Sequence, residues 1–201
     1  MKVASDIKKP DNELWKDFRQ GSMDAFSEIY TLHIQALNNY GRKLSKNQKL
    51  VEDCIQDLFI DIWKSKENLS DTNSIKYYLF KSLRRKIVRE GQVSQNIILE
   101  IEENYFFELC DSPEALIINQ QSEDIQSLKL NEALHKLTKR QREAIYLKFY
   151  QDLSFQEVSS VMSLGMKSTY NLISKSVEEL RRHLNKNDVF IILVLFLSYI
   201  V

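Results

Sequence analysis

Residues 51–63 read VEDCIQDLFIDIW, and their pattern decides the fold class. Six apolar side chains recur there at the spacing that places them on one face of an α-helix: Val51, Cys54, Ile55, Leu58, Phe59 and Ile62. The opposite face is mostly polar. The stretch predicts an amphipathic helix, and four Gly and two Pro in 201 residues leave few other places where a helix must stop. The sequence therefore favours an all-α chain.

Polar capping residues divide the first part of the chain into four predicted helices. Asn12 and Ser22 are the expected N-caps of the first two, and the stretch quoted above supplies the third. Ser74 would cap a fourth helix, which is predicted to reach Glu90. Residues 11–90 thus form the first predicted domain.

Charge is segregated along the chain, although the formal net charge is zero. Residues 74–90 hold six bases and one acid, residues 91–127 hold eight acids and no Lys or Arg, and residues 135–186 are basic again. This layout indicates two nucleic-acid surfaces separated by an acidic linker at 91–127, with local apolar footholds at 97–101 and 105–109.

Two capping boxes mark helix starts in a second predicted domain, residues 128–186. Thr138 is followed by Gln141, and Ser154 by Glu157. After a turn at 163–165, a further helix is expected to turn these residues inward: Met166, Thr169, Ile173, Val177, Leu180 and Leu184. A short helix, a turn containing Gly and a second helix form a helix-turn-helix pattern.

These segments resemble the extracytoplasmic-function sigma factors of the sigma-70 superfamily, over roughly residues 13–184. Residues 51–63 resemble the core-binding segment of that family, SIKYYLFKSLRRKIVRE (74–90) its promoter-melting helix, and residues 130–184 its promoter-reading module. The resemblance implies two small helical domains, sigma region 2 and sigma region 4, the second a winged-helix-like or four-helix unit containing the helix-turn-helix.

Individual residues make the resemblance more specific and also show where this sequence departs from the family. KSTYNLI (167–173) is similar to the iron-transport subgroup, whose members are commonly controlled by membrane-embedded anti-sigma factors. The family usually has Asn where Arg85 stands, and Gly where Ser163 stands, the glycine of this loop being shifted to Gly165. These departures bear on base choice and on the geometry of the turn.

The resemblance implies three binding surfaces. The outer face of the third helix would dock on the β′ clamp helices of core RNA polymerase, whose β flap is a further expected contact; that face comprises Asp53, Gln56, Asp57, Ile60 and Asp61. The fourth helix would bind melted minus-ten promoter DNA through Tyr77, Lys81, Arg84, Arg85, Lys86 and Arg89. The last helix would read the minus-thirty-five element through Lys167, Ser168, Tyr170, Asn171, Ser174 and Lys175, while phosphates would be contacted by Lys139, Arg140 and Arg142.

Elementary chemistry agrees with these roles, and each has a plainer alternative. Basic side chains track phosphates, and interleaved aromatic rings stack on unpaired bases; Tyr78 and Phe80, however, are equally compatible with a core, and about half of these aromatics are expected to be buried. Arg84 and Lys86 are expected to lie away from the docking face. The loop at 66–73 would hold a flipped base, by resemblance alone. The docking and reading faces could instead be solvated helix faces, and the acidic linker either enters the polymerase cleft or is a disordered connector.

The sequence contains no catalytic or metal-binding signature. Cys54 and Cys110 are interpreted as reduced thiols, and His33, His135 and His183 lack the spacing of metal ligands. We therefore expect no enzymatic activity, no cofactor and no metal. The N-terminus lacks the apolar core of a secretory signal, which predicts a cytoplasmic protein.

The hydrophobic C-terminal tail, residues 187–201, lies beyond the resemblance. Its VFIILVLFLSYIV (189–201) would reach about 20 Å as a helix, short of the roughly 30 Å of a bilayer core. It would pack on the protein, enter the inner membrane part-way or bind a membrane anti-sigma factor. The alternative function for the chain is a helix-turn-helix regulator with a helical sensor domain; a pure adaptor has no need of two basic segments.

Overall fold

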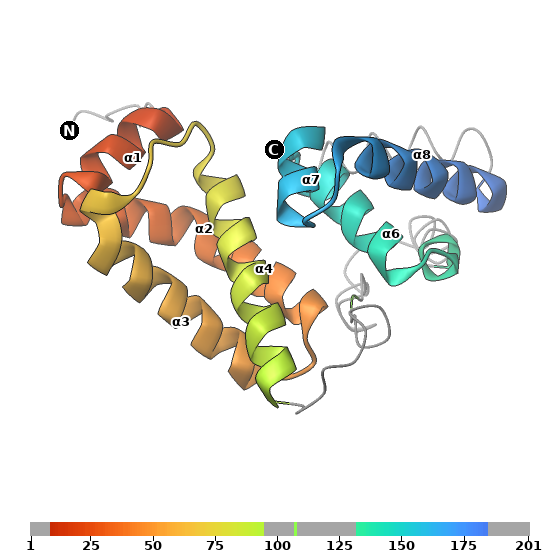
Figure 1. Ribbon diagram of the computed structural model, residues 1–201, viewed down its shortest axis with the longest axis horizontal. Helices are drawn as coiled ribbons and strands as arrows, with labels where there is room; N and C mark the ends of the chain where they lie inside the picture. Colours follow the sequence, from red (N-terminus) through yellow and green to blue (C-terminus); the bar gives the residue numbers. More distant parts are fainter. Residues whose placement is uncertain (1–8, 95–106, 108–131, 185–201) are drawn as a thin grey trace, which may run out of the picture. The chain divides into compact units, whose positions relative to one another are not determined.

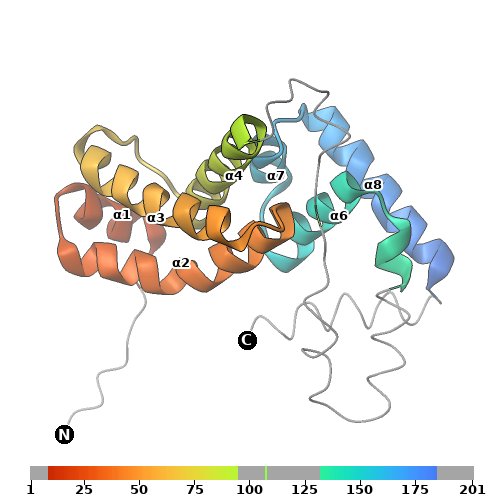
Figure 2. The same ribbon diagram turned by 90° about the horizontal axis from the view of Figure 1, so that it is seen from below.

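The computed structural model describes residues 9–94, Phe107 and residues 132–184. The chain divides into two compact units, Met1–Ile97 and Ile98–Val201. Figures 1 and 2 show the helices of each unit from two directions. Every regular element within the described ranges is helical, so the predicted all-α fold is confirmed.

Helices α2, α3 and α4 form the body of the first unit, and α2 and α3 each pack along α4 (Figure 1). In chain order the elements are α1 (Asp11–Arg19), α2 (Met23–Leu44), α3 (Gln48–Ser65), the short 3-10 helix η1 (Lys66–Asn68) and α4 (Ile75–Ser94). All six apolar residues predicted for the inner face of α3 are buried, as expected. Aromatic rings join the elements: Phe26 of α2 lies 5.0 Å from Trp63 of α3, centroid to centroid.

Helix boundaries in this unit follow local capping chemistry. The Ser22 hydroxyl accepts a hydrogen bond from the Ala25 amide at 3.2 Å, and Ser74 accepts one from Tyr77 at 3.2 Å, which confirms both predicted caps. The cap predicted at Asn12 is wrong. The N-cap of α1 is Pro10, whose carbonyl accepts the first helical hydrogen bonds, and Asn12 lies within the first turn.

A glycine ends helix α1 but does not end helix α4. Gly21 takes a φ of 90° directly after α1, and the Ser22 amide donates back to the Asp17 carbonyl at 3.1 Å, which closes the helix. At the other end of the unit, α4 continues to Ser94 rather than stopping at Glu90. A single glycine such as Gly91 costs a helix only about 1 kcal/mol relative to alanine, so it does not end one by itself.

The second unit contains a helix-turn-helix. Residues 132–136 are helical, and α6 (Lys139–Ile145), the π-helical turn η3 (Tyr146–Tyr150), α7 (Phe155–Val161) and α8 (Met166–His183) follow. Both predicted capping boxes are present at Thr138 and Ser154. A winged form is not seen, because the described residues 132–184 contain no strand from which a wing could be built.

One detail of this unit agrees with the apolar foothold predicted at 105–109, and another was not predicted. Within the acidic stretch, Phe107 is fully buried and packs edge-on against Tyr146 of η3, with ring centroids 5.7 Å apart. At the start of α8, Met166 is 41% exposed instead of turned inward. It is the first residue of the helix. The other predicted inward residues of α8 are buried or partly buried.

Candidate functional site

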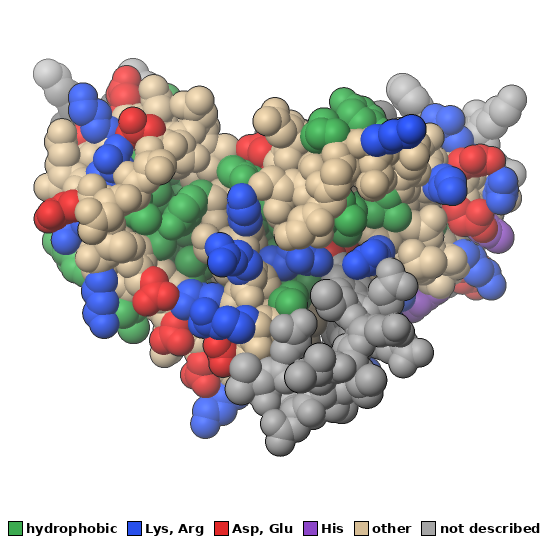
Figure 3. Space-filling view, in the orientation of Figure 1, with side chains coloured by type: hydrophobic (Ala, Val, Ile, Leu, Met, Phe, Trp, Pro, Cys, Tyr) green, Lys and Arg blue, Asp and Glu red, His purple; other side chains and the backbone are tan. Residues whose placement is uncertain are grey.

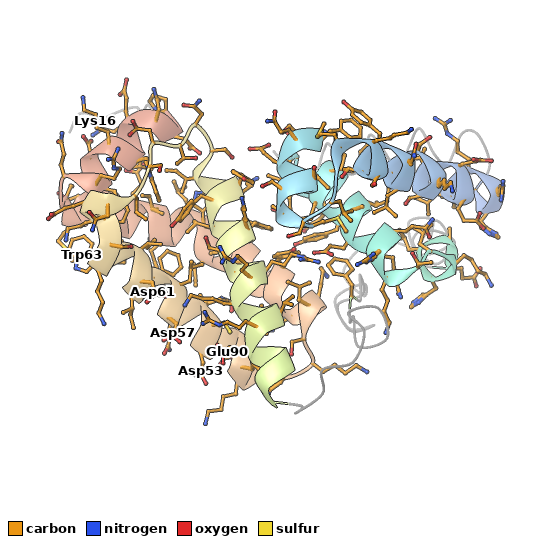
Figure 4. The ribbon with its side chains drawn as sticks, viewed as in Figure 1. Lys16, Asp53, Asp57, Asp61, Trp63 and Glu90 are labelled. Atoms are coloured by element: carbon orange, nitrogen blue, oxygen red, sulfur yellow. The ribbon has the colours of Figure 1, made fainter. Side chains whose placement is uncertain are left out.

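The outer face of α3 carries the residues predicted to dock on a polymerase. Asp53, Gln56, Asp57 and Asp61 are exposed, and Ile60 keeps 47% of its surface accessible. Figure 4 shows the three carboxylates in a row along α3. An acidic row with one exposed aliphatic side chain suits a basic helical partner, since charge guides the encounter and the apolar group adds contact area.

The basic face of α4 carries the residues predicted to bind melted DNA. Arg85 and Arg89 are exposed, whereas Lys81 and Arg84 are half-buried. Lys81 Nζ donates to the Tyr77 hydroxyl at 3.1 Å, which holds a cation beside a half-buried ring. Figure 3 shows Lys and Arg side chains gathered over this helix.

The aromatic residues of α4 divide as expected. Phe80 is fully buried and stacks on Tyr40 of α2, with ring centroids 4.8 Å apart. Tyr78 is half-buried, and its burial raises the pKa of its hydroxyl against the opposing effect of a hydrogen bond to Ser82. Phe80 is therefore a core residue, whereas Tyr77 and Tyr78 both keep part of their surface accessible.

Lys86 does not lie where it was expected. Its Nζ is 2.6 Å from Asp61 Oδ2 on the acidic row of α3, and its side chain is only 16% exposed. The premise that Lys86 points away from the docking face is therefore wrong. Its position follows from the packing of α3 along α4, a contact between residues 25 positions apart that no local pattern indicates.

The loop between η1 and α4 borders a polar cavity of about 680 Å³. Its lining comes from two sources, α1 and the loop predicted to hold a flipped base: Asn12, Lys16, Arg19, Gln20, Glu67, Asp71, Thr72 and Asn73. Figure 4 labels Lys16 on α1. The involvement of α1 was missed at the level of sequence, because its residues are more than 45 positions away from the loop and carry no motif.

The first turns of α8 present the predicted recognition surface. All six residues are exposed: Lys167, Ser168, Tyr170, Asn171, Ser174 and Lys175. Tyr170 stacks on Phe155 of α7 with ring centroids 4.3 Å apart and an interplanar angle of 21°, so its ring is oriented by the preceding helix. An exposed polar helix face of this kind can hydrogen-bond to base edges in a major groove.

The bases of α6, predicted to contact phosphates, differ in exposure. Lys139 is exposed, whereas Arg140 and Arg142 are half-buried. The Nε of Arg142 is buried without a hydrogen-bond partner in the described part of the chain, so the predicted phosphate contact would involve its terminal nitrogens. Lys139 is therefore the cleaner probe of a phosphate contact.

The described ranges contain no group of three acidic, His or Cys residues close enough to hold a metal ion. They also contain no helix long and apolar enough to cross a membrane. The hydrophobic tail, Cys110 and nearly all of the acidic linker lie outside the described residues.

Each of the two units matches a model of a known protein family. A model of sigma-70 region 2 matches residues 29–91, and a model of sigma-70 region 4 matches residues 127–180. Together these two matches cover more than half of the chain. They define the class: a helical transcription initiation factor with a region 2 unit and a region 4 unit.

Individual relatives agree with this class. The RNA polymerase sigma factor YlaC of Bacillus subtilis (strain 168) is 19% identical over 167 residues, covering 82% of this chain and 94% of the relative. The sigma factor NccH of Alcaligenes xylosoxydans xylosoxydans is 22% identical over 184 residues, covering 89% and 97%. The chain therefore belongs to the sigma-70 family of RNA polymerase sigma factors, as its resemblance to the extracytoplasmic-function class implied.

Solved structures share the fold. CnrH, in a complex with the cytosolic domain of CnrY, superposes with a TM-score of 0.55 at 19% identity, covering 87% of this chain and 96% of that one. The sigma factor RpoE of Bartonella quintana, in a complex with the anti-sigma factor NepR, gives 0.52 at 21% identity, covering 82% and 99%. The iron-transport subgroup stays a prediction.

Proposed function

We propose that this sigma factor directs promoter-specific initiation by placing three separate surfaces against polymerase and DNA. The acidic row of α3 binds the clamp helices of core RNA polymerase, the basic face of α4 holds the melted minus-ten strand, and α8 reads the minus-thirty-five element. The observation that carries the proposal is the exposure of the complete α8 set on the second helix of a helix-turn-helix. The polymerase supplies the chemistry.

Two finer assignments complete this proposal. A base flipped from the minus-ten element enters the cavity beside residues 66–73, where polar groups offset the loss of stacking. An anti-sigma factor holds the protein inactive in the cytoplasm, a proposal supported by the solved relatives RpoE and CnrH, which were captured with NepR and with CnrY.

Reconstituted transcription tests the proposal. Purified full-length protein is added to core polymerase with a library of genomic fragments, and run-off products are sequenced. We expect discrete start sites that share two elements at minus ten and minus thirty-five. Core polymerase alone is the control, and the absence of new start sites would refute the function.

A simpler assay distinguishes the sigma factor from the alternative, a stand-alone regulator, because the two differ in their affinity for core polymerase. Such a protein binds duplex DNA by itself as a dimer and has no affinity for core polymerase. In gel filtration, co-elution with core polymerase supports the sigma assignment, and a dimer that elutes separately from polymerase supports the regulator.

A further inference from the structure

Three side chains join one face of α1 to the loop that precedes α4 and to the first residue of that helix. Asp11, Trp15 and Arg19 are spaced four residues apart, which places them in a row along the helix. Asp11 Oδ2 accepts a hydrogen bond from the Ile75 amide at 2.8 Å, and Trp15 Nε1 donates to the Ser70 carbonyl at 2.9 Å. The third member, Arg19, forms an ion pair with Asp71. Each contact bridges more than 50 positions of sequence.

These contacts give the loop a fixed support. Within the loop, the Leu69 amide reaches the Lys66 carbonyl at a long 3.4 Å, and Thr72 bonds locally to Ser74. Trp15, by contrast, is 1% exposed and packs its ring 5.1 Å from Tyr78 of α4. The loop is therefore held against a side chain that is itself immobilised by the core.

The ion pair between Arg19 and Asp71 affects the position of the loop more than the stability of the fold. Asp71 is 91% exposed, so solvent screens its attraction to Arg19 and the net contribution to folding is small. The Arg19 Nε, however, is buried, so this end of the guanidinium packs against the protein while Nη1 pairs with Asp71. The pair thus sets where Asp71 lies on the cavity wall.

The same helix supplies half of that cavity. The lining residues are Asn12, Lys16, Arg19 and the C-cap Gln20 from α1, together with Glu67, Asp71, Thr72 and Asn73. Moving the loop relative to α1 would change the shape of the cavity and the positions of its hydrogen-bonding groups. The matched region 2 model begins at residue 29, so α1 lies outside it.

We propose that Asp11, Trp15 and Arg19 are positioning residues. They hold the loop at residues 66–73 in the conformation that selects an unpaired DNA base of the minus-ten element. The proposal rests on the proposed function, because it concerns the loop assigned there to the flipped base. It assigns α1 a part in promoter selectivity in addition to its place in the core.

The test measures selectivity at the minus-ten element with holoenzyme reconstituted from core polymerase and full-length protein. The probes are a promoter found by run-off transcription and its versions with each other base at every minus-ten position. The readout is the ratio of transcription from the best base to that from the worst. Arg19→Ala and Asp11→Ala should lower this ratio at least fivefold at one position, and Asp11→Asn, which keeps a hydrogen-bond acceptor for Ile75, should restore most of it.

Matched controls separate positioning from general damage. Glu13→Ala alters an exposed residue of the same helix and should leave the ratio unchanged. Selectivity at the minus-thirty-five element should be unchanged in every variant. The proposal is overturned if Arg19→Ala and Asp11→Ala keep the wild-type ratio, or if both lower transcription evenly for all bases and Asp11→Asn fails to recover selectivity. If the wild-type protein yields no promoter-specific transcript, the proposed function itself fails, which is a different outcome.

Discussion

Ser163 occupies a backbone conformation that suits glycine. Its φ is 55°, and the hydrogen bond from the Leu164 amide to the Ser159 carbonyl, at 2.9 Å, closes the C-terminus of α7 around it. A left-handed conformation costs a residue with a Cβ about 1–2 kcal/mol. Gly165, only two residues later, has an ordinary φ of −73° as the N-cap of α8. The glycine of this turn is thus displaced from the position that needs it.

The first prediction follows from this displacement. Ser163→Gly should stabilise the helix-turn-helix by about 1 kcal/mol, seen as roughly fivefold slower hydrogen exchange for amides of α7 and α8. Ser174→Gly, the same change at an exposed site within α8, should instead destabilise the helix by about 0.5 kcal/mol and speed exchange roughly twofold. Equal effects of the two changes would contradict the argument from backbone conformation.

Cys54 provides a prediction that depends on pH. The thiol is 4% exposed, and burial is the main reason why its pKa is raised above the ordinary 9.0. The folded state therefore favours the protonated thiol, so its contribution to stability is fully present below pH 9 and is lost as pH rises above that value. In a Cys110→Ser background, the stability advantage of wild type over Cys54→Ala should be about 1 kcal/mol at pH 7 and should shrink above pH 9. Urea denaturation at several pH values measures it, and a constant difference would contradict it.

At the scale of elements, α3 and α4 should separate two activities. Asp57→Arg places a positive charge on the exposed acidic row and should weaken association with core polymerase at least tenfold, because a basic partner is then repelled. Arg84→Ala should leave that association unchanged and slow open-complex formation. Pull-down and permanganate footprinting measure the two effects. Normal association of Asp57→Arg, or normal melting by Arg84→Ala, would contradict the assignment of that surface.

Helices α6 and α8 should make different contributions to DNA binding: α8 should determine sequence selectivity, and α6 should add affinity that does not depend on sequence. Asn171→Ala should relax sequence choice at the minus-thirty-five element by about 1–3 kcal/mol at one base pair, since an amide can bond bidentately to adenine. Lys139→Ala should weaken binding evenly across sequences and reduce the salt dependence by about one unit. Binding of duplex variants by holoenzyme at several salt concentrations distinguishes them, and identical behaviour would refute the division.

Local signals explain which elements could be predicted from sequence. The inner face of α3 and the capping boxes at Thr138 and Ser154 are set by residues within one or two turns of each other, so periodicity and spacing revealed them. The π-helical turn η3 could not be predicted, because it depends on a local change from the usual bonding, in which the Gln151 amide reaches the Tyr146 carbonyl.

Parts of the site that depend on distant residues also escaped prediction. Helical spacing predicted the inward residues of α8 except Met166, and the family resemblance pointed to its outward residues. The pairing of Lys86 with Asp61 and the contacts of α1 with residues 70–75 join segments 25 to 64 positions apart. Such contacts are fixed by tertiary packing, for which a single sequence carries no direct signal.

The hydrophobic C-terminal tail should be separable in function from the two helical units. Residues 189–201 lie outside the described part of the chain, and their sequence predicts three alternatives: packing on the protein, partial entry into the membrane, or binding to a membrane anti-sigma factor. Deletion of the tail distinguishes the last two alternatives from the first. In the last two cases, deleting residues 189–201 should preserve transcription in vitro, move the protein from the membrane fraction to the cytosol and raise basal activity in cells. Loss of transcription by the purified truncated protein would show that the tail belongs to a folded core instead.

The ion pair between Lys86 and Asp61 has a consequence for how binding events influence one another. One partner lies on the surface proposed for polymerase and the other on the helix proposed for DNA. If polymerase binds Asp61 as proposed, Lys86 would be freed to contact phosphate, and each ligand would then raise the affinity for the other. Because Asp61 is 61% exposed, the coupling free energy is bounded near 1 kcal/mol, or about fivefold in affinity. This cooperativity should fade as salt is added, because salt screens the charges that carry it.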